Sequence, residues 1–280
     1  MSFNSVPKAE SSNSELPPKK LSMHIYILPN LLTTANLFCG FYAVILSIQN
    51  QVRYAAYAIV AASVFDLLDG RLARLTRSTS KFGAEYDSLS DLISFCMAPA
   101  VLLYLWALQP FGRMGWLASF LFVACGALRL ARFNVQAEVI EKAYFQGLPT
   151  PMAAGIVASS VLAFEDLGWE AQGFTGLLAM TIVVAILMVS SFRYRSFKDL
   201  DLKERLPFSY LVLGVVLIAW VAYRPEVHLF VLFLSYAVLG GLFGVFKLRY
   251  KLKPKSSVYS PDKQVDEDLI EDEAEKRDPK

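Results

Sequence analysis

Four aspartates stand at regular intervals inside or beside apolar stretches of the chain: Asp66, Asp69, Asp87 and Asp91. If these stretches are helical, the spacings of three and four residues place the members of each pair on one helix face. Stacked carboxylates repel each other, and at membrane depth each one costs roughly 2.5–3.5 kcal/mol or more to bury. A bound cation would offset both costs, so the pattern predicts a cation site.

The type of cation follows from the ligand atoms, which are all carboxylate oxygens. No histidine or cysteine stands between the first and the last of these aspartates, so zinc is not favoured. Hard cations such as Mg²⁺ or Mn²⁺ prefer such oxygens, and two ions about 3.5–4 Å apart would support displacement at phosphorus. The alternative is that the acids are helix caps or surface charges paired with nearby Arg and Lys, but a cap needs one acid.

A longer motif surrounds the aspartates. It reads Asp66-x-x-Asp69-Gly70-x-x-Ala73-Arg74, then eight residues, then Gly83-x-x-x-Asp87-x-x-x-Asp91. At every specified position it resembles the signature of the CDP-alcohol phosphotransferase family. The resemblance implies an enzyme that uses Mg²⁺ or Mn²⁺ held by the four aspartates, with Asp91 also as the general base. It further implies contacts to the cytidine nucleotide from Gly70, Ala73, Arg74 and Gly83.

Two later segments resemble the branch of this family that makes phosphatidylserine. They are Arg129-Leu-Ala-Arg132-Phe-Asn and Gly147-Leu-Pro-Thr-Pro151. This resemblance implies CDP-diacylglycerol and L-serine as substrates. Arg129 and Arg132 share a helix face and could bind the donor phosphate or the serine carboxylate, although basic residues also mark cytoplasmic helix ends. Asn36, an amide within the first apolar stretch, either contacts substrate or packs against another helix.

Two other functions are compatible with the same residues. A member of the family could use another acceptor, namely glycerol 3-phosphate, an inositol phosphate or choline. A carrier of divalent cations would also place carboxylates within the membrane, but near its midplane and with access from both sides. A Ser-His or Cys-His catalytic pair is not expected, because the two histidines, His24 and His228, fall on opposite sides of the predicted membrane.

The composition indicates a membrane protein, since 55% of the residues are hydrophobic and the mean hydropathy is +0.42. We expect an all-α polytopic bundle of about eight transmembrane helices, six of which form the catalytic core. Apolar runs of sufficient length lie near 28–48, 53–73, 88–109, 114–134, 150–166, 173–192, 207–223 and 226–246. The aspartates weaken the hydropathy signal of the second and third runs. Three parts are predicted: a polar segment (1–24), the membrane domain (25–250) and a charged tail (251–280).

Charge asymmetry predicts the orientation of the bundle. Lys and Arg gather in alternate connections and in both terminal segments, whereas the other connections keep only Arg53, Arg113 and Arg224. This bias places both termini and the aspartates on the cytoplasmic side of the cell (inner) membrane. Contact with membrane lipid is expected and nucleic acid is not. The family resemblance further implies a homodimer, although no face in the sequence identifies its interface.

Overall fold

The computed structural model describes residues 24–76, 80–137, 145–190, 193–194 and 208–251. The helices begin with α1 (His24–Ile48) and α2 (Val52–Thr76). A long helical stretch follows, made of α3 (Lys81–Asp91), the π-helix η1 (Leu92–Met97), α4 (Ala98–Leu103), the π-helix η2 (Tyr104–Leu108) and the 3₁₀ turn η3 (Gln109–Phe111). The remaining helices are α5 (Arg113–Ala137), α6 (Thr150–Leu167), α7 (Thr175–Val189), α8 (Phe208–Tyr223) and α9 (Pro225–Lys251).

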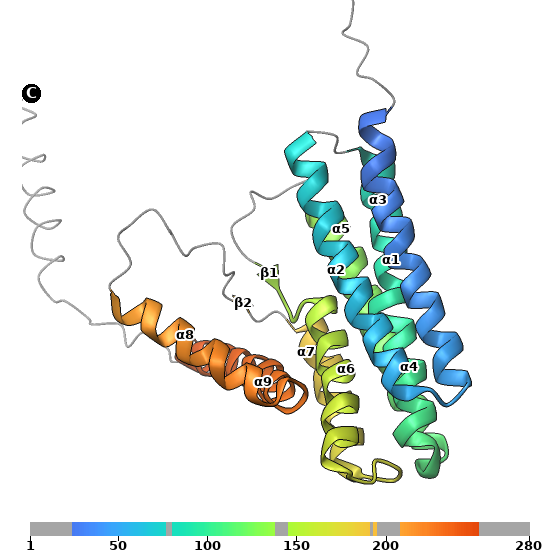
Figure 1. Cartoon of the computed structure of the whole chain (residues 1–280), viewed down its shortest axis with the longest axis vertical. Helices are drawn as coiled ribbons and strands as arrows, with labels where there is room; N and C mark the ends of the chain where they lie inside the picture. Colours follow the sequence, from blue (N-terminus) through green and yellow to red (C-terminus); the bar gives the residue numbers. More distant parts are fainter. Residues whose placement is uncertain (1–23, 77–79, 138–144, 191–192, 195–207, 252–280) are drawn as a thin grey trace, which may run out of the picture.

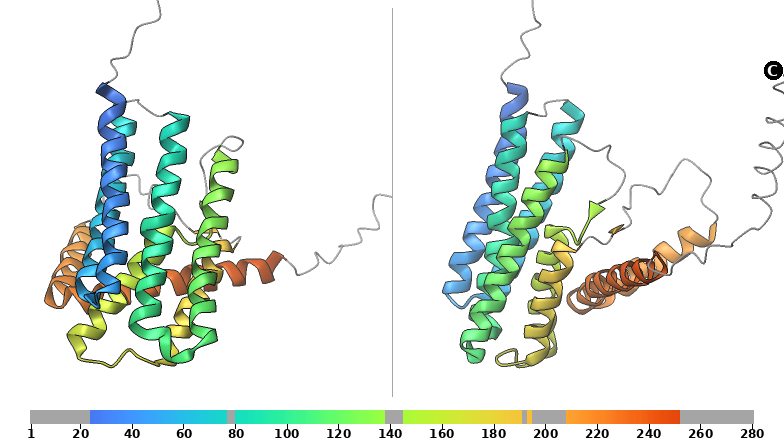
Figure 2. Two further views of the ribbon diagram at one scale, coloured as in Figure 1. Left: turned by 90° about the vertical axis from the view of Figure 1, so that its right-hand side faces the viewer. Right: turned by 180° about the vertical axis from the view of Figure 1, so that it is seen from behind.

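The first helices form an upright bundle (Figure 1). Short turns join α1 to α2 and η3 to α5, so neighbouring helices run in opposite directions. The shorter helices α6 and α7 pack against α2 and α5, respectively. As Figure 2 shows from two further sides, α8 and α9 lie at a steep angle to the rest, with α9 in contact with α6. The helices from α1 to α7 therefore build the bundle, and α8 and α9 lie beside it.

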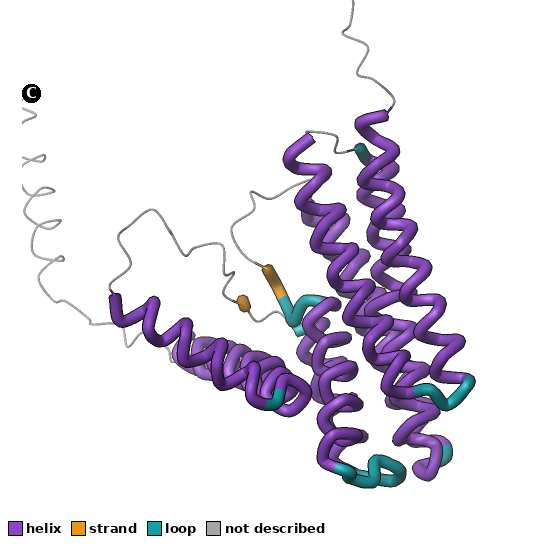
Figure 3. The backbone as a smooth tube through the Cα atoms, in the orientation of Figure 1, coloured by secondary structure: helices purple, strands orange, loops and turns teal. Residues whose placement is uncertain are grey.

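The expected all-α architecture is confirmed, with one small addition. Two-residue strands, β1 (Phe145–Gln146) and β2 (Arg193–Tyr194), pair antiparallel, with Phe145 opposite Tyr194 (Figure 3). They connect the segment just before α6 to the segment just after α7. The pairing thus holds the approach to α6 close to the end of α7.

Apolar helices long enough to cross a membrane support the expected polytopic protein. Among the described residues, four helical stretches are long and apolar enough on their own to cross a membrane: Leu28–Ile48, Lys81–Phe111, Arg113–Val135 and Pro225–Leu242. Each of the eight predicted spans overlaps a helical stretch of the described chain. Large apolar side chains also face outward, for example Phe38 (65% exposed) and Phe120 (63% exposed). Such side chains are stable when lipid covers them.

The interior contains both large apolar side chains and points of very close helix contact. Phe95 and Phe122 are fully buried in the central core. A methyl group on Gly40 would overlap Ser94, and one on Gly126 would overlap Cys96, so glycine lets these helices approach each other. Cys96 and Cys125 are buried and unpaired, as expected for small packing residues.

The predicted division into three parts stays a prediction. Residues 1–23 and 252–280, which make up nearly all of the two predicted terminal segments, lie outside the described residues.

Candidate active site

The aspartate motif occupies two neighbouring helices that run in opposite directions. Asp66 and Asp69 lie on α2, ten and seven residues before its end at Thr76. Asp87 and Asp91 lie on α3, whose first turn is capped by Ser80, with the Gly83 N–H donating to the Ser80 hydroxyl at 2.9 Å. This cap fixes where α3 begins and therefore which face its aspartates present.

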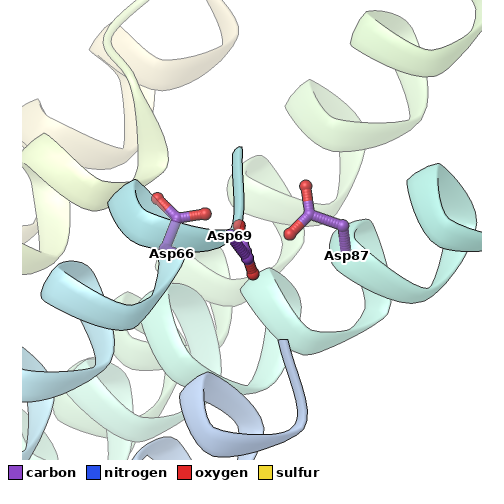
Figure 4. A group of neighbouring side chains, drawn as sticks. All are labelled: Asp66, Asp69 and Asp87. Atoms are coloured by element: carbon purple, nitrogen blue, oxygen red, sulfur yellow. The ribbon is translucent and has the colours of Figure 1, made fainter. Parts of the chain in front are cut away.

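Three of the carboxylates converge between the helices. Asp66, Asp69 and Asp87 each offer an oxygen within 4.8 Å of the oxygens of the other two. In Figure 4 the Asp69 side chain stands between those of Asp66 and Asp87. Oxygens that share one cation at 2.0–2.6 Å can be at most about 5 Å apart. The measured spacing is therefore compatible with a shared cation.

A second observation tests the same fit. Oδ1 of Asp87 is buried and has no hydrogen-bond partner among the described residues. A buried carboxylate oxygen without a donor is costly, and a cation would satisfy it. The donor set is made of oxygens alone, which suits Mg²⁺ or Mn²⁺ better than zinc. The residues present therefore fit a hard divalent cation.

Asp91 lies beside this trio, at the last residue of α3. Asp66 and Asp87 are among the charged groups that interact with it electrostatically. Asn36 of α1 donates from Nδ2 to Asp91 Oδ1 at 3.3 Å. The π-helix η1 begins at the next residue, and π-helical turns often occur at functional sites. The structure thus brings Asp91 to the aspartate cluster, next to an amide that holds one of its oxygens.

The four residues predicted to contact nucleotide lie on the same two helices. A methyl group on Gly70 would face only the Arg74 guanidinium among the described atoms, at 3.8 Å. One on Gly83 would lie 3.1 Å from the Ser80 hydroxyl and 3.5 Å from Asn30 Oδ1. The capping contact therefore accounts for Gly83 without a ligand, whereas a methyl group at Gly70 would make only ordinary contact with the Arg74 side chain. Arg74 is exposed and Ala73 is half-buried on the same turns.

Arg129 is a buried cation that interacts electrostatically with Asp91. It lies on α5, is 8% exposed, and donates from Nη1 to the Thr150 hydroxyl at 3.1 Å. Its Nε is buried without a hydrogen-bond partner in the part of the chain that the structure describes. Arg129 thus has an unused donor near the predicted base.

Arg132, one turn further along α5, contacts a different part of the protein. Its Nη1 donates to the Val189 carbonyl at 3.0 Å and its Nη2 to the Ser190 carbonyl at 3.3 Å. These carbonyls close the C-terminal end of α7, a common place for a cationic side chain. Close by, Leu148 N–H donates to the Leu187 carbonyl at 3.0 Å. Arg132 therefore holds the end of α7, and its predicted contact with substrate stays a prediction.

Several polar residues around the site were not assigned a role from the sequence. Thr33 donates to Asp69 Oδ2 at 2.9 Å, and the Ser90 and Ser94 hydroxyls donate to the carbonyls of Thr33 and Asn36 at 3.1 and 3.0 Å. The i, i+4 spacing of the two serines is a signal for one helix face, but it does not identify their partners on α1. Asn36, for which the sequence left substrate contact and helix packing open, is fully buried, and its Oδ1 has no partner among the described residues.

Comparison with known proteins agrees with this geometry. Residues 26–192 match the model of the CDP-alcohol phosphatidyltransferase family. A CDP-diacylglycerol–serine O-phosphatidyltransferase of Helicobacter pylori is 37% identical over 238 residues, which cover 83% of this chain and 98% of the relative. A protein of the same name from Mycobacterium tuberculosis is 29% identical and covers 79% of each chain.

A third relative comes from an archaeon. An archaetidylserine synthase of Methanothermobacter thermautotrophicus is 39% identical over 181 residues, which cover 63% of this chain and 72% of the relative. The matched family region runs from residue 26, near the start of α1, past the end of α7 and contains all four aspartates, whereas α8 and α9 follow it. The chain belongs to the CDP-alcohol phosphatidyltransferase family.

Proposed function

We propose that the protein transfers the phosphatidyl group of CDP-diacylglycerol to the hydroxyl of L-serine, which gives phosphatidylserine and CMP. One observation carries the proposal: three carboxylates converge in a chain that aligns with a serine O-phosphatidyltransferase over 98% of the relative's length. The alternative acceptors, glycerol 3-phosphate, an inositol phosphate and choline, appear in none of the relatives' names reported above.

The aspartates would bind the cations on which the family depends. We assign Asp66, Asp69 and Asp87 as ligands, with Asp91 within reach, and we expect Mg²⁺ or Mn²⁺. When bound, such ions would neutralise the donor pyrophosphate and stabilise the charge that develops on the leaving phosphate. The unpartnered oxygen of Asp87 supports this assignment.

Asp91 would act as the general base. In the proposed step the serine hydroxyl oxygen forms a bond to the phosphorus that bears diacylglycerol, and the bond from that phosphorus to the CMP oxygen breaks. The hydroxyl proton passes to the Asp91 carboxylate, and CMP leaves with the electron pair of the broken bond. The Asn36 amide at 3.3 Å would orient the base for this transfer.

The remaining contacts would come from α2, α3 and α5. Arg129, with its free Nε, would bind the serine carboxylate or the donor phosphate. Gly70, Ala73, Arg74 and Gly83 would line the nucleotide, where the absence of a side chain at Gly70 leaves room beside Arg74. The diacylglycerol chains would stay in the surrounding lipid.

The proposed site opens to the cytoplasm, and both termini lie on that side of the cell (inner) membrane. Two features support this orientation. Basic residues concentrate in the connections on one side, and Asp66 and Asp69 lie in the half of α2 that leads to its C-terminal end. A water-soluble serine and a membrane-bound donor would meet at such a boundary. A carrier would need the carboxylates to be open to both sides.

The test is CMP release by the purified full chain in detergent, with CDP-diacylglycerol and Mn²⁺ or Mg²⁺. We expect release that depends on L-serine and on the cation. Release with glycerol 3-phosphate, inositol phosphate or choline in place of serine would keep the site and overturn the acceptor. No release with any acceptor, from protein that unfolds cooperatively on heating, would contradict the enzyme and favour cation transport. The homodimer is a separate prediction, to be checked by the mass of the detergent-solubilised protein.

A further inference from the structure

The first helix carries no aspartate, yet it reaches both pairs of them through one polar face. Thr33 lies on this face, one turn before Asn36, and is 4% exposed. Its hydroxyl lies 2.9 Å from Asp69 Oδ2 on α2 and 3.1 Å from the carbonyl of Pro29 on its own helix. Two acceptors therefore compete for the single proton of this hydroxyl.

The Asp69 carboxylate should be the preferred acceptor of this proton. Hydroxyls within helices commonly donate to the carbonyl four residues earlier, as Ser47 does to Ala43 at 2.7 Å and Thr76 to Leu72 at 2.8 Å. At Thr33 the carbonyl is farther away than the carboxylate. A hydrogen bond to a charged acceptor is roughly twice as strong as one to a neutral acceptor. The proton therefore points toward Asp69.

The main chain of the same residue is tied to the other aspartate helix. Ser90 of α3 is fully buried, and its hydroxyl donates to the Thr33 carbonyl at 3.1 Å. Ser90 lies between Asp87 and Asp91 in the sequence. One residue of α1 thus contacts the Asp69 side chain on α2 and, through Ser90, the turn of α3 that carries the other pair. Its position fixes one helix relative to the other.

We propose that Thr33 is a positioning residue that orients the Asp69 carboxylate for cation binding. A carboxylate that accepts a hydrogen bond at one oxygen presents its remaining lone pairs in a fixed direction, and such outer contacts raise affinity for a ligand. The contact also keeps Asp69 at the spacing it has from Asp66 and Asp87. The proposal rests on the proposed function only for the kind of cation.

The experiment compares Mn²⁺ binding by the unaltered full chain with binding by its Thr33 variants, in detergent and without substrates. Binding is measured from the electron paramagnetic resonance signal of free Mn²⁺. Thr33→Val keeps the shape of the side chain and removes its donor, so the dissociation constant should rise about 10-fold, at the lower end of the effects of such outer contacts. Thr33→Ser restores the donor and should bind Mn²⁺ within about two-fold of the unaltered chain.

Thr34→Val is the matched control. Its hydroxyl donates to the Asn30 carbonyl at 2.8 Å and lies 2.9 Å from the Tyr86 hydroxyl, without contact to an aspartate among the described residues. This variant should bind Mn²⁺ as the unaltered chain does. Thermal unfolding without Mn²⁺ checks that each variant is folded, and Thr33→Ala replaces Thr33→Val if the latter does not fold.

Two outcomes would overturn the proposal: unchanged Mn²⁺ affinity in the folded variant that lacks the hydroxyl, or an equal loss in Thr33→Ser. The acceptor assay separates this result from the proposed function. Weaker Mn²⁺ binding in Thr33→Val, in a chain that releases no CMP with serine, would support the positioning role and contradict the transferase. Unchanged Mn²⁺ binding by Thr33→Val, in a chain that releases CMP with serine, would support the transferase and contradict the positioning role.

Discussion

The side-chain amide of Asn36 donates to the Asp91 carboxylate at 3.3 Å, and the Asn36 carbonyl accepts from Ser94 at 3.0 Å. These two contacts join α1 to the end of α3 and to the start of η1. They place the amide in a position to act on the reaction through Asp91, in addition to any contact of its free Oδ1 with substrate.

Replacing Asn36 by Ala should separate these two roles. If the amide acts through Asp91, kcat should fall about 10-fold while the KM for serine changes little, because outer contacts of this kind act on the catalytic group. If it binds serine directly, the KM for serine should rise instead. Initial rates of CMP release over a range of serine concentrations distinguish the two cases.

Asp91→Asn should remove the proposed general base while keeping the size of the side chain. We expect kcat to fall by about 10² to 10⁴, the usual contribution of a positioned base. The assay needs saturating Mn²⁺, so that weaker cation binding does not account for the loss. Turnover close to that of the unaltered chain under these conditions would mean that another group takes the proton.

Because Asp66, Asp69 and Asp87 lie close together, loss of one of these carboxylates should have opposite effects on stability with and without metal. Asp87→Asn removes one of three close carboxylates, so the metal-free variant should unfold at a higher temperature than the metal-free unaltered chain. In return it should lose most of the stabilisation by Mn²⁺, which is about 2.7 kcal/mol at one hundred times the dissociation constant. Thermal unfolding with EDTA and with Mn²⁺ measures both effects.

Glu85→Gln serves as the control for this result. Glu85 is an exposed acid on the same helix, and it accepts from Asn134 Nδ2 at 3.2 Å, outside the three-carboxylate cluster. This variant should keep the rise in unfolding temperature that Mn²⁺ causes.

EDTA should also abolish CMP release by the unaltered chain, and added Mn²⁺ or Mg²⁺ should restore it. A chain that stays fully active after chelation would contradict the cation assignment.

The two arginines of α5 should respond differently to the same substitution. Arg129→Lys keeps a positive charge and loses the unpartnered Nε, so the KM for serine or for the donor should rise. Arg132→Lys should mainly lower the unfolding temperature, because it weakens two bonds to the carbonyls at the end of α7. Loss of bonds to a charged group costs about 1.5–3 kcal/mol each. If Arg132→Lys raised the KM for a substrate and left the unfolding temperature unchanged, the result would support the predicted contact of Arg132 with substrate.

The sequence alone predicted the eight helical stretches and the four aspartates, because both depend on local spacing. Apolar length defines a span, and intervals of three and four residues define a helix face. The convergence of Asp66 and Asp69 with Asp87 was also foreseeable, since a short connection joins α2 to α3.

The partners of the polar residues on other helices could not be predicted in the same way. Thr33 reaches Asp69 across 36 residues of sequence, and Arg132 reaches Val189 across 57. Such contacts depend on the rotation of each helix about its axis, which hydropathy does not fix when both faces are apolar. The π-helical turn after Asp91 could not be predicted either; η1 packs against α1 and α5, and helix propensity carries no signal for a π-helix.

Gly40 provides the last test, which concerns the distance between α1 and η1. A methyl group there would lie 2.6 Å from the Ser94 Cα and would also overlap the Ser94 side chain. Because a main-chain atom is in the way, a smaller residue at 94 would not relieve the overlap, and α1 must move. Gly40→Ala should therefore destabilise the protein by about 1–3 kcal/mol.

The same movement should also reduce turnover, because Asn36 lies one turn before Gly40 and holds Asp91. Gly214→Ala is the matched control, since a methyl group at this position on α8 meets no described atom within 4 Å. That variant should be neutral or more stable by up to about 1 kcal/mol, the difference in helix propensity. Thermal unfolding and CMP release are measured on both variants. If Gly40→Ala lowered stability and left kcat unchanged, the close approach of α1 would serve packing alone.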